Sequence, residues 1–260
     1  MEEIITAMAA KLTEVRGVSG VMLGGSRARG EERPDSDWDL GLYYRGELDL
    51  DALNELAGPG VEVAPPGEWG PWVNGGAWLR VDGVAVDWIL RDLDRVERVW
   101  AECQEGRHEV GVQAGHPLGF WSPCYVGELA LGRVLADPGG ELAALKKETA
   151  HYPPALRRSL VNAAWEAEFL VTVAAKSAPR GDALHVSLCL SHAFGVLCQA
   201  LYASAERWLL NEKGSLDIAA TLPGAPDGFA GRVREILTDL GPRAVERAGV
   251  LVAEVRGALG

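Results

Sequence analysis

Aspartates at strand-like positions are the residues of this chain whose types and spacing could carry out chemistry. Asp37 and Asp39 stand two apart at the start of a short apolar run that ends at Tyr44. Alternate residues of a strand point to the same face, so both carboxylates can converge on one point. Converging carboxylate oxygens bind hard cations, and magnesium takes one or two carboxylates together with substrate phosphates. The spacing therefore predicts a magnesium site at the start of this strand.

A glycine-rich turn precedes these aspartates. Gly25 and Ser26 follow the short, branched apolar run Val18–Leu23, a pattern that predicts a strand leading into a turn. Backbone N–H groups of such a turn and the Ser26 hydroxyl can hold phosphate oxygens. Arg29 is a further candidate for these phosphates, because a guanidinium makes charge-assisted hydrogen bonds to them. We expect this segment to bind the phosphates of a substrate.

A further carboxylate lies in a second strand-like run. Asp87 is at the centre of the apolar segment Val84–Leu90, where an unpaired charge would be costly to bury. It therefore needs a partner such as a metal ion. Carboxylates on neighbouring strands are typical of metal-assisted phosphoryl or nucleotidyl transfer, in which two ions clamp the attacking and leaving oxygens.

The spacing of these residues resembles that of the nucleotidyltransferase superfamily that includes DNA polymerase beta. The signature of that superfamily is a Gly-Ser pair, a spacer of about ten residues and then Asp-x-Asp, and four positions matched by chance at such a spacing would be rare. Here ten residues separate Gly25-Ser26 from Asp37-Trp38-Asp39. The amino-acid sequence of this segment and the length of the chain are similar to those of the bacterial aminoglycoside and lincosamide nucleotidyltransferases.

The resemblance implies a role for each matched residue. It makes Asp37, Asp39 and Asp87 the catalytic metal ligands, with two Mg²⁺ ions the expected cofactors. It also implies that Gly25 and Ser26 hold the triphosphate of the donor, with ATP the expected donor.

Two further roles remain open at this stage. Related enzymes use an acidic residue as the general base, and Asp87 is the first candidate, with Glu166 or Glu168 of the C-terminal half as alternatives. Several relatives also place a lysine of the second domain on the phosphates, which makes Lys176 a candidate for nucleotide binding.

Hydrophobic periodicity predicts an α+β fold: an N-terminal nucleotidyltransferase domain with a mixed sheet flanked by helices, followed by an α-helical bundle. Asp82-Gly83 predicts a tight type I′ hairpin between two strands. From residue 93 onward the pattern is almost entirely helical. We expect domains at residues 1–118 and 119–260, with the active site between them. Predicted helices cover residues 4–15, 50–56, 93–103, 125–135, 142–148, 154–175, 182–205, 228–240 and 243–259, and predicted strands cover 18–23, 39–44, 61–63, 78–81 and 84–90.

Composition narrows the class of partner. The chain has 260 residues, 48% of them hydrophobic, and a net charge of −12. This acidity disfavours nucleic acid and anionic membranes and favours a cationic ligand. The four cysteines form no C-x-x-C pair, so buried free thiols are expected. We see no apolar run long enough to span a bilayer and an acidic rather than basic N-terminus, and we therefore expect a cytoplasmic protein.

The acceptor is predicted from charge and from one aromatic loop. Trp69, Trp72 and Trp78 lie near Glu62 and Glu68, and aromatic faces beside carboxylates suit an amine-bearing ligand. The leading hypothesis is transfer of AMP from ATP to a hydroxyl of a small cationic molecule such as an aminoglycoside, as in antibiotic resistance. Two alternatives are a protein adenylyltransferase, as in minimal nucleotidyltransferase antitoxins, and a non-catalytic nucleotide-binding regulator. Oligomeric state is not predicted.

Overall fold

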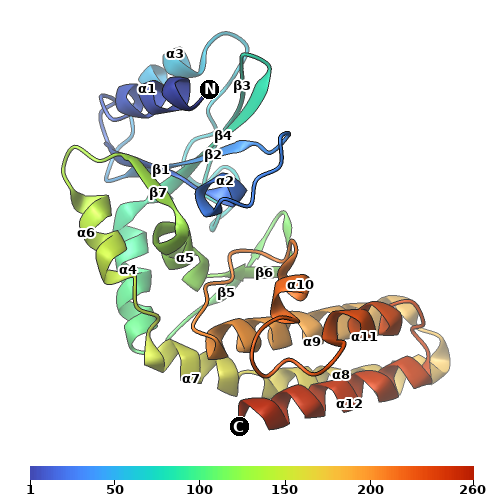
Figure 1. Ribbon diagram of the computed structural model, residues 1–260. Coiled ribbons are helices and arrows are strands. Elements are labelled where there is room, and N and C mark those ends of the chain that lie inside the picture. Colours follow the sequence, from blue (N-terminus) through green and yellow to red (C-terminus); the bar gives the residue numbers. More distant parts are fainter. The chain divides into compact units, whose positions relative to one another are not determined.

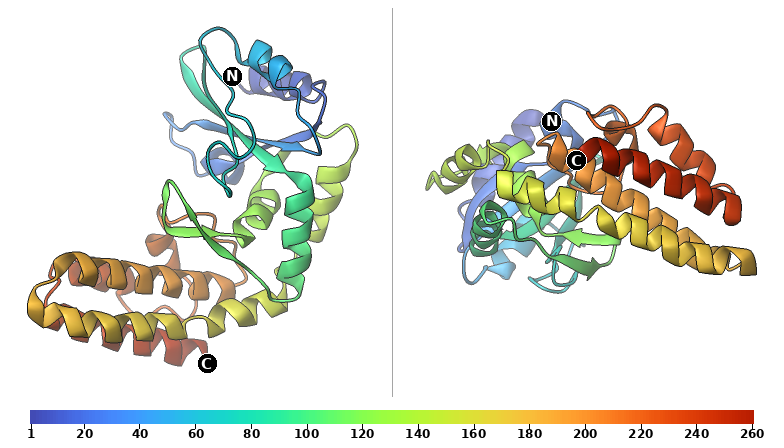
Figure 2. Two further views of the ribbon diagram at one scale, coloured as in Figure 1. Left: turned by 180° about the vertical axis from the view of Figure 1, so that it is seen from behind. Right: turned by 90° about the horizontal axis from the view of Figure 1, so that it is seen from below.

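The computed structural model describes residues 1–260, which form two compact units (Figures 1 and 2). The first unit comprises Met1–Glu102 and His108–His151, and the second comprises Cys103–Arg107 and Tyr152–Gly260. This division differs from the predicted boundary at 118/119. The reason is that residues 123–148 supply a strand and two helices to the first unit. The role of the C-terminal part in substrate binding stays a prediction.

A five-stranded mixed sheet forms the centre of the first unit, in the order β3-β4-β2-β1-β7. Only β2 and β4 run parallel, and the remaining neighbours are antiparallel. This arrangement confirms the predicted α+β class with a mixed sheet. The strands are β1 (Val18–Leu23), β2 (Trp38–Tyr44), β3 (Gly76–Val81), β4 (Val84–Asp92) and β7 (Arg133–Ala136).

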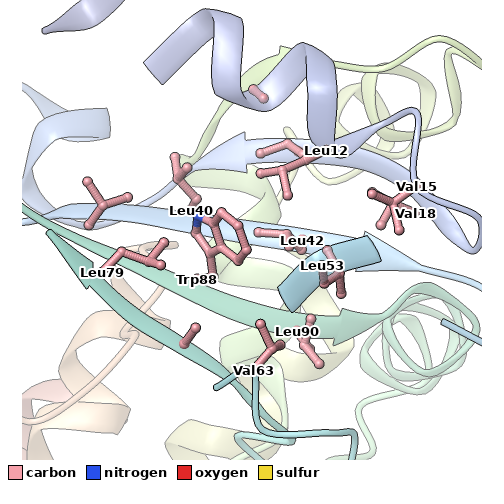
Figure 3. Packing of buried hydrophobic residues seen from close by; sticks show 14 of the residues in the cluster. Leu12, Val15, Val18, Leu40, Leu42, Leu53, Val63, Leu79, Trp88 and Leu90 are labelled. Atoms are coloured by element: carbon pink, nitrogen blue, oxygen red, sulfur yellow. The ribbon is translucent and has the colours of Figure 1, made fainter. Parts of the chain in front are cut away.

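Alternation of side chains along the strands gives the sheet one fully apolar face. Leu40 and Leu42 of β2 pack beside Trp88 and Leu90 of β4, and all four are fully buried (Figure 3). Helices α1 (Glu2–Leu12) and α3 (Leu50–Ala57) cover this face. Because strand residues alternate, the residues between these four must point to the opposite face.

Shorter elements complete the first unit. Asp82 and Gly83 both have positive φ, 51° and 80°, which confirms the predicted type I′ turn between β3 and β4. A separate two-stranded hairpin is formed by β5 and β6. The remaining elements are α2 (Gly25–Arg29), α4 (Leu93–Gln104), β5 (Val110–Gln113), β6 (His116–Trp121), α5 (Pro123–Leu131) and α6 (Glu141–Glu148).

The second unit is helical, as predicted. Its centre is α9 (Ala183–Ser204), which packs against α7 and α8, and α12 lies along α8. The other helices are α7 (Pro154–Asn162), α8 (Trp165–Ser177), α10 (Ser215–Ala219), α11 (Phe229–Ile236) and α12 (Pro242–Leu259), with a short 3₁₀ turn at Ala178–Arg180.

Helix α9 corrects one expectation. It is long and apolar enough to cross a membrane by length and composition, with a mean hydropathy of 1.5. More than half of this window, 56%, is buried inside the protein, as is usual for the central helix of a folded domain.

All four cysteines are free and buried, which confirms the prediction of buried free thiols. Two of them, Cys189 and Cys198, lie on α9.

Several predicted elements differ from the observed ones. No strand forms over 61–63, where Asn54 binds the backbone N–H of Val63 through its side chain at 2.8 Å. The helix predicted over 125–135 ends at Leu131, because Arg133–Ala136 pairs with β1 as a strand. The helix predicted over 154–175 is divided into α7 and α8. The hairpin β5–β6 was not predicted.

The buried face of the sheet predicts a large effect of shortening its largest side chain. Trp88 is fully buried, so Trp88→Ala should lower the free energy of unfolding by about 3–5 kcal/mol. Val112 is 93% exposed, and Val112→Ala should change the free energy of unfolding by less than about 0.5 kcal/mol. Urea titration of both variants tests this. Equal stability of the two variants would contradict the assigned core.

Candidate active site

Two of the predicted carboxylates are brought together by strand pairing. Asp39 of β2 is the register partner of Asp87 of β4 in the parallel pair. Leu40 and Trp88 face the apolar core, so both aspartates point to the opposite face of the sheet. Each is half-buried. The structure therefore places the two carboxylates side by side on one face.

The same register fixes a second, closed part of that face. Tyr43 is paired with Arg91 four residues further along the two strands. The Arg91 side chain is 4% exposed, and its guanidinium binds Glu128 of α5 through two hydrogen bonds of 2.6 and 2.7 Å. An ion pair of this geometry, with a buried arginine, fixes how α5 lies on the sheet. Helix α5 thus covers this end of the face, which carries none of the predicted catalytic aspartates.

Burial dominates the electrostatics of this closed part. It raises the pKa of the Tyr43 hydroxyl well above its usual value and raises the pKa of Tyr125 to about 12. Burial alone would lower the pKa of Arg91, but the charge and hydrogen bonds of Glu128 outweigh it and hold the pKa above its usual value. Arg91 is therefore a fixed cation and the two tyrosines are neutral at physiological pH.

The predicted phosphate turn lies directly against Asp39. The backbone N–H of Gly24 donates to the carbonyl of Asp39 at 2.7 Å. Gly25 has φ +61°, and a Cβ at this position would lie 1.8 Å from Asp39 Oδ2. Only glycine allows the carboxylate and the turn to approach so closely. Ser26 follows in the first turn of α2 and is half-buried.

Arg27 of α2 holds the segment that carries Asp37. Its Nε donates to the carbonyls of Ser36 and Asp37 at 3.1 and 3.0 Å, and its guanidinium lies 4.5 Å from the ring centroid of Trp38. These contacts join α2 to the residues immediately before β2. No residue pattern indicates this role, because a loop arginine next to Ser26 is equally consistent with a solvated or phosphate-binding side chain.

The remaining predicted residues of the first unit lie as follows. Asp37 is exposed and precedes β2 by one residue. Arg29 forms an ion pair with Glu31 at 2.8 Å on the surface of α2. The assignment of Asp37 to metal and of Arg29 to phosphate stays a prediction.

Three candidates lie on α8 of the second unit. Lys176 is exposed near its end. Glu166 lies 3.5 Å from His192 of α9, and Glu168 forms an ion pair with Arg256 of α12. Their assignments to phosphate binding and to general base catalysis stay predictions.

The carboxylates of this site suit a metal ion that binds together with a nucleotide. No group of three His, Cys, Asp or Glu side chains in the chain forms a ready-made metal cluster. Magnesium, however, is usually bound by one or two carboxylates, and phosphates and water complete its coordination. Asp39 and Asp87 supply two carboxylates on one face, beside the turn that Gly25 opens. The residues therefore fit a magnesium nucleotide.

The aromatic residues of the predicted ligand-binding loop separate into two groups. Trp69 stacks on Trp78 of β3, with ring centroids 4.3 Å apart. Trp72 instead packs against Phe120 and lies 4.6 Å from the guanidinium of Arg95. The three indoles therefore do not form one surface. Gln113, which no sequence pattern indicated, hydrogen-bonds to the backbone of Trp69 in one group and of Trp72 in the other.

Comparisons with known proteins show what the N-terminal part is similar to. Residues 1–93 match the family model described as nucleotidyltransferase domain. A solved structure described as a nucleotidyltransferase-like protein from Exiguobacterium sibiricum 255-15 is similar, with a TM-score of 0.44 and 12% sequence identity, over 99% of this chain and 72% of that one. No curated protein matches the chain.

The contact between Gly25 and Asp39 predicts a specific effect of one methyl group. Gly25→Ala should weaken binding of Mg·ATP at least tenfold, because the new Cβ displaces the Asp39 carboxylate. Gly30→Ala is the matched control, since Gly30 has φ +68° with nothing within 4 Å of the added Cβ. Both variants should lose about 1–2 kcal/mol of stability from the positive φ. Calorimetric titration measures the affinity, and equal affinities of the two variants would contradict the role of this contact.

The hydrogen bonds of Arg27 predict that charge alone does not suffice at this position. Arg27→Lys keeps the charge but removes the planar donor group that binds the carbonyls of Ser36 and Asp37. We expect about a three- to tenfold loss in affinity for Mn²⁺ in the presence of ATP, measured by electron paramagnetic resonance, because Asp37 is no longer held in place. Arg16→Lys is the control, as Arg16 contacts Glu47 on the surface. An Arg27→Lys variant with wild-type Mn²⁺ affinity would contradict this role.

Proposed function

Taking residues 1–93 as a nucleotidyltransferase domain, we propose that the chain transfers a nucleoside monophosphate from a magnesium-bound nucleoside triphosphate to a hydroxyl of a small molecule. ATP is the proposed donor, and a cationic compound such as an aminoglycoside is the proposed acceptor. The observation that carries this proposal is the pairing of Asp39 with Asp87 on one sheet face, directly against the turn at Gly25.

The proposed reaction is a displacement at the α-phosphorus of the donor. The acceptor oxygen forms a bond to this phosphorus, the bond from it to the bridging oxygen of the β-phosphate breaks, and pyrophosphate leaves with that electron pair. Asp87 takes the proton of the acceptor hydroxyl. Its place on β4, the strand next to β2, supports this role, because it sets the base beside the carboxylate of Asp39.

Asp37 and Asp39 are the proposed ligands of magnesium, together with Asp87. When bound, magnesium would neutralise charge on the transferred phosphate and on the leaving pyrophosphate. Gly25 and Ser26 would orient the triphosphate, with the backbone of the turn facing the β- and γ-phosphates. The protein contributes mainly position and charge, as is usual for transfer of phosphoryl groups.

Net charge supports a cationic acceptor. The chain carries 37 acidic against 25 basic side chains, which attracts a polyamine over long range and repels a polyanion. The acidic character also disfavours a nucleic-acid acceptor. Transfer to a protein would use the same donor chemistry. The products of the reaction distinguish a protein acceptor from a small-molecule acceptor.

The proposal is tested by mass spectrometry of a reaction that contains the protein, Mg²⁺, the four ribonucleoside triphosphates and a panel of aminoglycosides and lincosamides. We expect one panel compound to gain the mass of one nucleoside monophosphate. Asp39→Asn and Asp87→Asn should each lower the rate by about 10²–10⁴-fold, since they remove a charge at the reacting centre. Chelation of Mg²⁺ by EDTA should abolish the product.

Asp49→Asn is the matched control, because Asp49 caps α3 on the apolar side of the sheet. This variant should retain the wild-type rate. Pyrophosphate release without a modified panel compound would favour another acceptor, such as a protein. Wild-type activity in Asp39→Asn and Asp87→Asn would contradict the assigned site.

A further inference from the structure

A row of side chains crosses three strands on the open face of the sheet. Trp78 of β3 is the register partner of Asp87 of β4, and Asp87 is the partner of Asp39 of β2. Directly paired residues point to the same face, and neighbouring strands lie about 4.8 Å apart. Trp78 therefore lies one strand beyond Asp87, on the side away from the phosphate turn.

Trp78 is exposed to an extent that is unusual for a tryptophan. Its relative exposure is 68%, although the preceding and following residues of β3, Ala77 and Leu79, are buried. One side of its indole is covered by Trp69, with ring centroids 4.3 Å apart and an angle of 17° between the planes. The other side presents a large flat surface beside a carboxylate.

The supporting ring is held firmly in place. The backbone N–H of Trp69 donates to the carbonyl of Asn74 at 3.1 Å, and its own carbonyl accepts from the side chain of Gln113 at 2.6 Å. Gln113 also accepts from the N–H of Trp72 at 3.1 Å. These bonds fix the loop against β5, so Trp78 stacks on a rigid neighbour. A preorganised aromatic surface loses little entropy when a ligand binds.

We propose that the exposed indole face of Trp78 is the subsite that binds the ring of the acceptor, and that this ring carries a protonated amine. The inference rests on the proposed transfer reaction and specifies its acceptor. Tryptophan is the strongest aromatic partner for a cation, and the carboxylate of Asp87 lies on the adjacent strand. An aminated saccharide or cyclitol ring stacks through its C–H face on the indole while its ammonium group faces the carboxylates.

The order of the strands assigns this subsite to the acceptor rather than to the donor. The phosphate turn follows β1 and contacts Asp39 on β2, whereas Trp78 lies on β3 at the other side of Asp87. A hydroxyl that loses its proton to Asp87 therefore belongs to a molecule that extends over β3. The ring that bears this hydroxyl meets Trp78.

One basic side chain lies close to the subsite. Arg80, two residues after Trp78 on β3, is on the same face of the strand. Its guanidinium donates to the carbonyl of Gly83 at 2.9 Å, in the hairpin turn at the end of the strand. This hydrogen bond holds its charge at the turn, whereas Asp87 is the direct register partner of Trp78.

Binding measurements on the full chain test the proposal. The probes are kanamycin, streptomycin and glucosamine, each titrated calorimetrically in the presence of Mg²⁺ and a non-hydrolysable ATP analogue. Trp78→Ala should weaken binding of the tightest probe about tenfold, and Trp78→Phe should retain most of it. The affinity for the Mg²⁺ complex of the ATP analogue should stay within about twofold of wild type. Trp165→Ala, which removes an exposed tryptophan that contacts Phe169 on α8, is the matched control.

The outcomes separate this inference from the reaction on which it rests. Equal probe affinities of Trp78→Ala and wild type, or no binding of any probe to wild type, would overturn the subsite. A loss of affinity for the ATP analogue in Trp78→Ala would overturn it too, because the indole would then bind the nucleobase. Failure of the wild type to bind the ATP analogue at all would contradict the proposed function itself.

Discussion

The parallel pairing of β2 with β4 is the constraint on which the rest of the first unit depends. Its register sets Asp39 beside Asp87 and, four residues later, Tyr43 beside Arg91. A shift of one residue would turn these side chains into the apolar core and bring Leu40 to the surface. The burial of Trp88 and Leu90 beneath α1 and α3 prevents that shift, so the core fixes the geometry of the carboxylates.

The two ends of the open sheet face serve different purposes. At one end, the ion pair between Arg91 and Glu128 anchors α5 and closes the face. At the other end, the carboxylates of Asp39 and Asp87 lie between the glycine turn and the exposed indole of Trp78. A rigid, hydrogen-bonded half thus lies beside the half that we propose binds the ligands, and catalysis by position and charge depends on such preorganised groups.

Local signals in the sequence predicted much of this arrangement. The spacing from Ser26 to Asp37, the type I′ turn at Asp82-Gly83 and the position of Asp87 needed only neighbouring residues. The strand Arg133–Ala136 was not predicted, because its partner β1 lies more than a hundred residues earlier and its own four residues read as the end of a helix. Arg27 was missed for a related reason: its partners are backbone carbonyls, which no residue pattern reveals.

We propose that the carboxylates paired by β2 and β4 bind a metal nucleotide. The most direct measurement is a crystal structure of the protein with Mn²⁺ and α,β-methylene-ATP, with diffraction recorded at the manganese absorption edge. We expect an anomalous peak in contact with the carboxylate of Asp39, with the triphosphate against the turn at Gly25 and Ser26. Nucleotide and manganese bound elsewhere on the chain, with Asp39 and Asp87 free of both, would contradict it.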